Sequence, residues 1–181
     1  GVRRAIAAYT QALDDGRTDD VVATFCADAT VEIPGMGTHV GADAIRYFMI
    51  SRSANSPIDF DLDLAMERSN ENPVYYIQYA HARVCSVLRQ MREKGFEHDE
   101  ARGRASLGRL VEPHEQALLA TMSRYPEVIE MAALQRAPHA LVHYLRELAT
   151  DFHAYYNAHQ FLVADESVRD ARITLIRGVR Q

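Results

Sequence analysis

The sequence predicts a mainly α protein, a helical bundle preceded by a short segment of mixed α and β structure. Beyond residue 41 the chain is a series of amphipathic helical patterns with short breaks, which is typical of a bundle. The residues before it combine two short helical patterns with one alternating, strand-like stretch. With 48% hydrophobic and 25% charged residues, the 181 positions suffice for one large domain or two small ones.

The N-terminal segment is predicted to form two helices and a strand. A helix over residues 3–13 ends before Gly16, since glycine is common just past a helix end. Thr18 can cap a second helix that runs to about residue 25. Residues 28–33 alternate polar and apolar side chains, as a strand does.

The middle of the chain contains two helices and two irregular stretches. Residues 42–52 read as a helix, and residues 56–64 alternate like an extended segment or a strand. Asn72 and Pro73 open a long helix to about residue 94, because asparagine caps helices and proline suits their first turn. The polar residues 94–109 are expected to form a loop or a mobile insertion.

The C-terminal part completes the bundle. Prolines mark two of its breaks, because proline interrupts a helix that precedes it. The predicted helices cover residues 112–124, 126–136, 139–161 and 167–180.

Composition excludes several kinds of function. The net charge of −5 disfavours a general nucleic-acid coat protein. The sequence contains no glycine-rich phosphate loop and no nucleophile elbow. Cys26 and Cys85 are too far apart for a zinc motif. We therefore expect neither a cofactor nor catalytic residues. Without an apolar run that could span a bilayer or serve as a signal core, the expected location is cytoplasmic and a membrane partner is not expected.

Two polar patterns resemble metal sites but lack parts of them. His139 and His143 lie one helical turn apart, without a glutamate between them, so we interpret them as ordinary, partly exposed histidines. Asp59, Asp61 and Asp63 alternate as calcium ligands can, yet the loop glycine and terminal glutamate of that site are missing. A solvated strand edge is the favoured interpretation, and no metal is expected.

One helix face carries the most informative side chains. Tyr76, Tyr79 and Arg83 are spaced i, i+3, i+7 and therefore share a face. Two phenols and a guanidinium suit the stacking of unpaired bases. The alternative is a packing face with tyrosines at the rim of the core, and the spacing alone leaves both open.

A family resemblance favours the first alternative. It rests on residues 41–49, 51–53, 59–65, 72–83, 125–128, 138–141, 152–157 and 169–172. These segments resemble the anticodon-binding domain of arginyl-tRNA synthetase, a class I synthetase. The resemblance implies an all-helical bundle that binds the anticodon stem-loop of tRNA(Arg), with Tyr76, Tyr79 and Arg83 beside the anticodon bases and Tyr156 on the facing helix.

The sequence departs from that family in two places. Neither the His-Ile-Gly-His nor the Lys-Met-Ser-Lys type of signature is present, and Lys94 is the single lysine. We therefore expect this chain, without the catalytic domain, not to activate arginine. It also stops short of the family's final helical segment, from which we expect weak tRNA binding.

The first residues resemble a different family. Residues 8–9, 13–16, 22, 25, 28–34 and 41–46 are similar to nuclear-transport-factor-2-like domains of the polyketide-cyclase and ketosteroid-isomerase type. The resemblance matches Tyr9 to a tyrosine that stabilises an enolate. It places Ile33 where the isomerases have their aspartate base, and isoleucine cannot move a proton. Isomerase activity is therefore not expected, and a small-molecule pocket ranks last among the hypotheses.

Together the two resemblances predict a chimera joined near residues 41–46. The predicted parts are a fragment over 1–46, a connecting segment over 47–71 and the anticodon-binding domain over 72–181. A natural fusion is the alternative origin. The alternative function is a chimera without selected activity, which self-associates through uncovered apolar faces.

Overall fold

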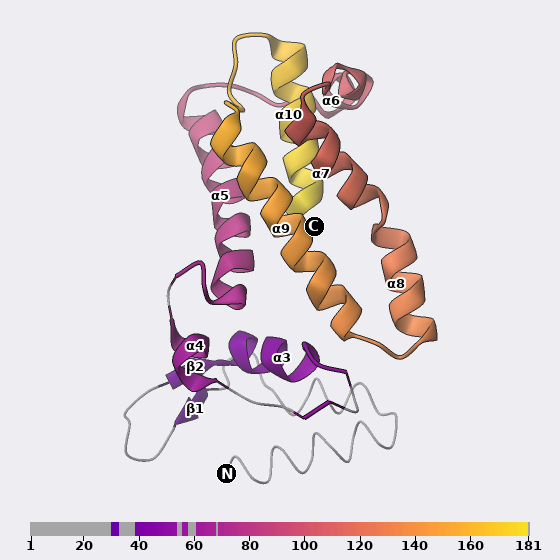
Figure 1. The fold of residues 1–181 in the computed structure, drawn as a ribbon. Helices are drawn as coiled ribbons and strands as arrows, with labels where there is room; N and C mark the ends of the chain where they lie inside the picture. The colour runs from indigo at the N-terminus through magenta and orange to yellow at the C-terminus, as the bar shows by residue number, and fades with distance from the viewer. Residues whose placement is uncertain (1–29, 33–38, 54–55, 58–60, 68, 181) are drawn as a thin grey trace. The chain divides into compact units, whose positions relative to one another are not determined.

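The computed structural model describes residues 30–32, 39–53, 56–57, 61–67 and 69–180 (Figure 1). The contacts divide the chain into two units, residues 1–74 and 75–181. The helices predicted over 3–13 and 18–25, together with Tyr9, Ile33 and Asp59, lie outside the described residues. The mainly α fold class is confirmed, and no described helix is long and apolar enough to cross a membrane.

The first unit contains a short hairpin and two helices. Strands β1 (Thr30–Glu32) and β2 (His39–Gly41) pair antiparallel, with Val31 opposite Val40. Helix α3 (Ala42–Ile50) follows β2 directly and buries Ala44 and Ile45. The strand within 28–33 and the helix within 42–52 were both predicted.

The extended segment predicted over residues 56–64 is wrong at its end. The structure has a short helix there, α4 (Leu62–Met66). Asp61 caps it, because its carboxylate accepts a hydrogen bond of 3.0 Å from the backbone N–H of Leu64. The alternation of aspartate with apolar residues, read as a strand, therefore includes a helix N-cap.

The second unit is built from α5 (Pro73–Glu93), whose first residues belong to unit 1, and the helices that follow. These are α6 (Glu100–Ala105), the 3₁₀ turn η1 (Leu107–Arg109), α7 (Pro113–Ser123), α8 (Tyr125–Leu134), α9 (His139–Ala158) and α10 (Glu166–Arg180). The core of the unit is formed mainly by α5, α9 and α10. From α5 come Ala80, Val84, Val87 and Met91, spaced as one face of a helix. Phe152 and Tyr155 of α9 and Ile173 and Ile176 of α10 complete its fully buried centre.

The loop predicted over residues 94–109 is wrong from residue 100 onward. Asp99 caps α6 by accepting a hydrogen bond of 2.9 Å from the Arg102 N–H. The Arg102 Nε donates to the fully buried Asp170 of α10 at 2.6 Å. Gly103 lies directly against the α10 backbone, so α6 is fixed by tertiary contacts rather than by its own helix propensity.

Candidate functional site

The side chains singled out on α5 meet a tyrosine of α9 around one guanidinium. The guanidinium carbon of Arg83 lies 4.5 Å from the ring centroid of Tyr79 and 4.5 Å from that of Tyr156. Both distances are within the range of cation–π contacts. Tyr79 is 38% exposed and the other two are half-buried, so this stack, which we call the Arg83 stack, lies at the protein surface.

Helix geometry and one cap position these residues. Asn72 caps the start of α5, since its Oδ1 accepts a 3.0 Å hydrogen bond from the Val74 N–H. Tyr79 and Arg83 are one turn apart on α5 and share a face. The predicted cap at Asn72 and the start at Pro73 are thus confirmed.

His153 of α9 orients the guanidinium. Its Nδ1 lies 3.0 Å from an Nη1 of Arg83, and its Nε2 lies 3.1 Å from the backbone oxygen of Tyr76. The guanidinium can only donate and the carbonyl can only accept. The ring must therefore be neutral, with its proton on Nε2 and its lone pair on Nδ1.

Burial favours the same neutral state. It lowers the pKa of the His153 imidazole, and the positive charge of Arg83 lowers it further, against the opposing effect of the hydrogen bond to Tyr76. The side chain of Asn157, one turn later on α9, also accepts from Arg83, at 3.3 Å. His153 and Asn157 are one helical turn apart on α9, and their shared partner Arg83 lies 70 and 74 residues before them in the sequence.

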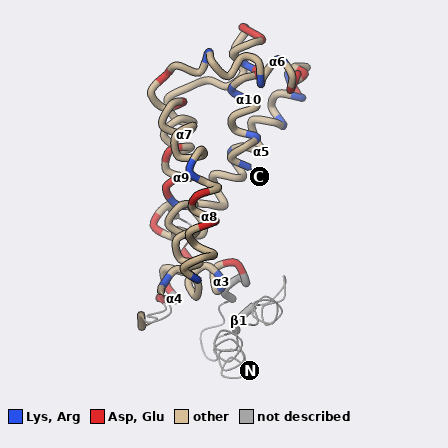
Figure 2. Tube along the Cα trace, turned by 90° about the vertical axis from the view of Figure 1, so that its right-hand side faces the viewer, with Lys and Arg blue, Asp and Glu red and all other residues tan. Residues whose placement is uncertain are grey.

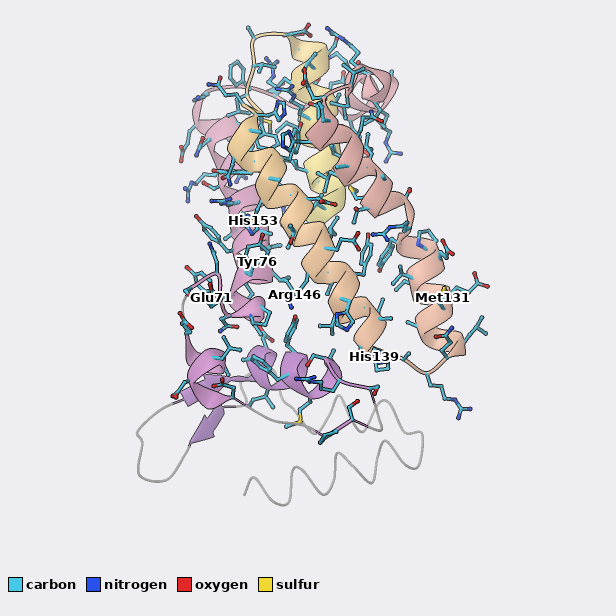
Figure 3. The ribbon with its side chains drawn as sticks, in the orientation of Figure 1. Glu71, Tyr76, Met131, His139, Arg146 and His153 are labelled. Atoms are coloured by element: carbon cyan, nitrogen blue, oxygen red, sulfur yellow. The ribbon has the colours of Figure 1, made fainter. Side chains whose placement is uncertain are left out.

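Tyr76 occupies a different position from the other predicted residues. Its ring packs on the core and lies 4.5 Å from the His153 ring, centroid to centroid, between α5 and α9 (Figure 3). Tyr75, which the sequence did not single out, stacks on Tyr79 at 6.0 Å with an interplanar angle of 16°. Tyr79 therefore has Tyr75 one turn before it and Arg83 one turn after it.

The other candidate residues form no such cluster. The rings of His139 and His143 are 6.3 Å apart and edge-on. Over the described part of the chain, no group of three or more histidine, cysteine, aspartate or glutamate residues could hold a metal ion. Acidic and basic positions are both scattered over the helices (Figure 2).

Comparison with protein families assigns the class of this fold. A model of the DALR anticodon binding domain matches residues 77–181, more than half of the chain. A model of the SnoaL-like domain matches residues 1–128. The chain therefore belongs to the DALR anticodon-binding family through its helical unit, and by the second match also to the SnoaL-like family. Both family models match residues 77–128, and this part of the structure contains only helices and connecting segments.

Individual relatives narrow the comparison to one kind of protein. The chain is 62% identical to the arginine–tRNA ligase of Thioalkalivibrio sulfidiphilus and 55% identical to that of Coxiella burnetii. Each alignment spans 142 residues, 78% of this chain and 24% of the relative. A crystal structure from Campylobacter jejuni, assigned as an arginyl-tRNA synthetase, has a TM-score of 0.64 and 25% identity, covering 82% of this chain and 34% of that one. The chain thus spans about a quarter of the length of its curated relatives.

Proposed function

We propose that the chain is the anticodon-binding part of an arginine–tRNA ligase and holds the anticodon loop of tRNA(Arg) at Tyr76, Tyr79, Arg83 and Tyr156. Its place of action would be translation in the cytoplasm. The observation that carries the proposal is the guanidinium between two tyrosine rings, because a planar cation there occupies the space that a planar base would take.

The Arg83 stack suggests how a base would enter. The two cation–π contacts contribute about 0.5–2 kcal/mol each, and stacking of a base on an aromatic ring contributes about 1–3 kcal/mol. Base stacking can thus replace the cation–π contacts, but a displaced guanidinium also gives up its hydrogen bonds to His153 and Asn157. The Nε of Arg83 is buried without a hydrogen-bond partner among the described residues, which lowers the cost of moving the side chain. A displaced guanidinium can pair with a phosphate.

Titration of a synthetic anticodon stem-loop at two salt concentrations tests the proposal. Tyr79→Ala should weaken binding by about 1–3 kcal/mol at both concentrations, and Tyr79→Phe should restore it, since the ring remains. Arg83→Ala should reduce the salt slope by about one phosphate contact. Arg146→Ala, which removes an exposed guanidinium elsewhere on α9, is the matched control (Figure 3). Wild-type affinity in both Tyr79→Ala and Arg83→Ala would refute the base-contact role.

We also propose that the chain joins two fragments, with the join near residues 41–46 as the sequence predicts. Matches to two different families support two sources, and the two matched ranges overlap over residues 77–128. Limited proteolysis with mass spectrometry tests the predicted parts. We expect a protected fragment beginning near residue 72, because α5 to α10 share one core. A protected fragment over residues 1–128 would instead favour a SnoaL-like small-molecule-binding fold.

Self-association remains the alternative to a selected activity. Met131 and Leu134 of α8 are 47% and 77% exposed and, three residues apart, share a face. Light scattering of the wild type and of Leu134→Glu measures the oligomeric state. A monomeric wild type that binds the stem-loop would argue against an inactive, self-associating chimera.

A further inference from the structure

A concave site lies beside the Arg83 stack and shares Tyr156 with it. A cavity of about 240 Å³ opens between the C-terminal half of α5 and the end of α9. Its polar walls are Gln90, Lys94, His159 and Gln160, and its aromatic walls are Tyr156 and Phe161. No carboxylate lines it, although the chain as a whole is acidic.

The wall formed by the end of α9 is held in place by its own contacts. The backbone oxygen of Gln160 accepts a 2.6 Å hydrogen bond from Arg172 of α10. His159 lies 3.3 Å from His114 of α7, measured between Nε2 and Nδ1. Phe161 is buried and meets the core residue Tyr155 edge-on at 4.9 Å. The cavity is therefore bounded by a fixed segment rather than by loose surface side chains.

Tyr156 connects this cavity to the Arg83 stack. Its ring is 4.5 Å from the Arg83 guanidinium and 5.8 Å, between centroids, from the Phe161 ring. Consecutive nucleotides of an unpaired loop can splay onto neighbouring stacking positions. A base held at Tyr79 and Arg83 would thus bring the next nucleotide to the Tyr156 side.

We propose that this cavity binds a second, adjacent nucleotide of the same RNA loop, with its base packed against the aromatic wall that Tyr156 and Phe161 form and its phosphate on Lys94. The inference rests on the proposed function. The amides of Gln90 and Gln160 each offer a donor and an acceptor, the combination that reads a base edge. The volume is below the roughly 300–1,000 Å³ typical of drug-sized ligands and suits a single base. Lys94, the only lysine of the chain, lines this cavity and would supply its phosphate contact.

Double-mutant cycles with the full chain test whether the cavity contacts one particular nucleotide of the loop. The probe is the synthetic anticodon stem-loop, wild type or with one abasic site at each loop position in turn. The double variant Gln90→Ala/Gln160→Ala removes both amides, and Lys94→Ala removes the ammonium group. Arg92→Ala is the control, because Arg92 is an exposed cation of α5 that does not line the cavity. Gln90 and Lys94 are exposed, so the fold should tolerate their replacement.

We expect the variant that lacks both amides to lose about tenfold in affinity for the wild-type stem-loop. For one abasic stem-loop, the losses caused by the protein change and by the missing base should not add, because both changes remove the same contact. The nucleotide identified in this way should be adjacent in the RNA to the nucleotide whose removal is non-additive with Tyr79→Ala. Lys94→Ala should reduce the salt slope by about one contact, and more than Arg92→Ala does. Additivity of the amide variant with every abasic position would overturn this inference while leaving the Arg83 stack intact. Absence of any coupling to Tyr79 or Arg83 would instead overturn the proposed function.

Discussion

Replacement of Gly103 by alanine tests whether α6 packs on α10 as the structure shows. A Cβ at this position would meet Thr174 Oγ1 and would lie 2.7 Å from the backbone oxygen of Asp170. Ordinary contacts of a Cβ begin at 3.4 Å, so α6 would have to retreat by roughly 0.7 Å. The backbone oxygen belongs to the middle of a helix and cannot move aside.

The expected cost combines two opposing effects. Overpacking of this kind costs about 1–3 kcal/mol, and a retreat of α6 also stretches the contact between Arg102 and the buried Asp170. Alanine recovers up to about 1 kcal/mol through its better helix propensity. We therefore expect a net loss of about 1–2 kcal/mol in the free energy of unfolding.

Urea unfolding followed by far-ultraviolet circular dichroism measures this loss. Gly108→Ala is the matched control, because a Cβ there meets nothing within 4 Å and the same change is made to the unfolded chain. It should be neutral or stabilise by up to about 1 kcal/mol. Equal unfolding midpoints for the two variants would show that residues 100–105 do not pack on α10, and the reasoning would fail.

Three further predictions concern buried polar groups. Glu115, almost fully buried, accepts hydrogen bonds from Arg172 at 2.8 Å and from Tyr155 at 3.1 Å. Glu115→Ala should cost about 3–5 kcal/mol, because Arg172 loses its carboxylate partner and keeps only the backbone oxygen of Gln160. A loss in chemical denaturation smaller than that of Tyr155→Phe would contradict this. Asn72→Ala removes the cap of α5 and should cost about 1–2 kcal/mol in the same assay. Asn72→Asp keeps the capping oxygen but should lose at least as much, because the amide of Asn72 also donates to the backbone oxygens of Ala65 and Glu67, at 3.2 and 2.8 Å, and a carboxylate cannot donate. The pKa of His153 is lowered by burial, so the unfolded chain binds its proton first, and stability should rise with pH in the window below about 6.5. Subtracting the pH profile of His153→Asn isolates this contribution, and identical profiles would exclude it.

Local signals predicted the parts of the fold that local interactions determine. Asn72 and Pro73 marked the start of α5, and Pro126 marked the break between α7 and α8. The common face of Tyr79 and Arg83 followed from helical spacing alone. These features depend on residues within a few positions of one another, which is what a sequence pattern records.

Tertiary contacts decided what the sequence did not reveal. Helix α6 has six residues and contains Gly103, so its propensity is poor, and its partner Asp170 is 68 residues from Arg102. The contact between His153 and Arg83 spans a similar separation. A glycine in a polar stretch indicates a loop until a close helix contact explains it.

The net charge of −5 does not decide where an RNA could bind, because it counts acidic and basic side chains over the whole chain and not their positions. Asp170, Glu115 and Asp165 form ion pairs of 2.6–2.8 Å with arginines of the α6, η1 and α10 regions. The proposed RNA contacts are instead Arg83 and Lys94, on or next to α5. Each phosphate contact to a single strand contributes a salt slope of about −0.7, so two contacts predict a slope near −1.4. A general coat protein would show a much steeper slope, which makes the slope a direct measure of whether binding is local.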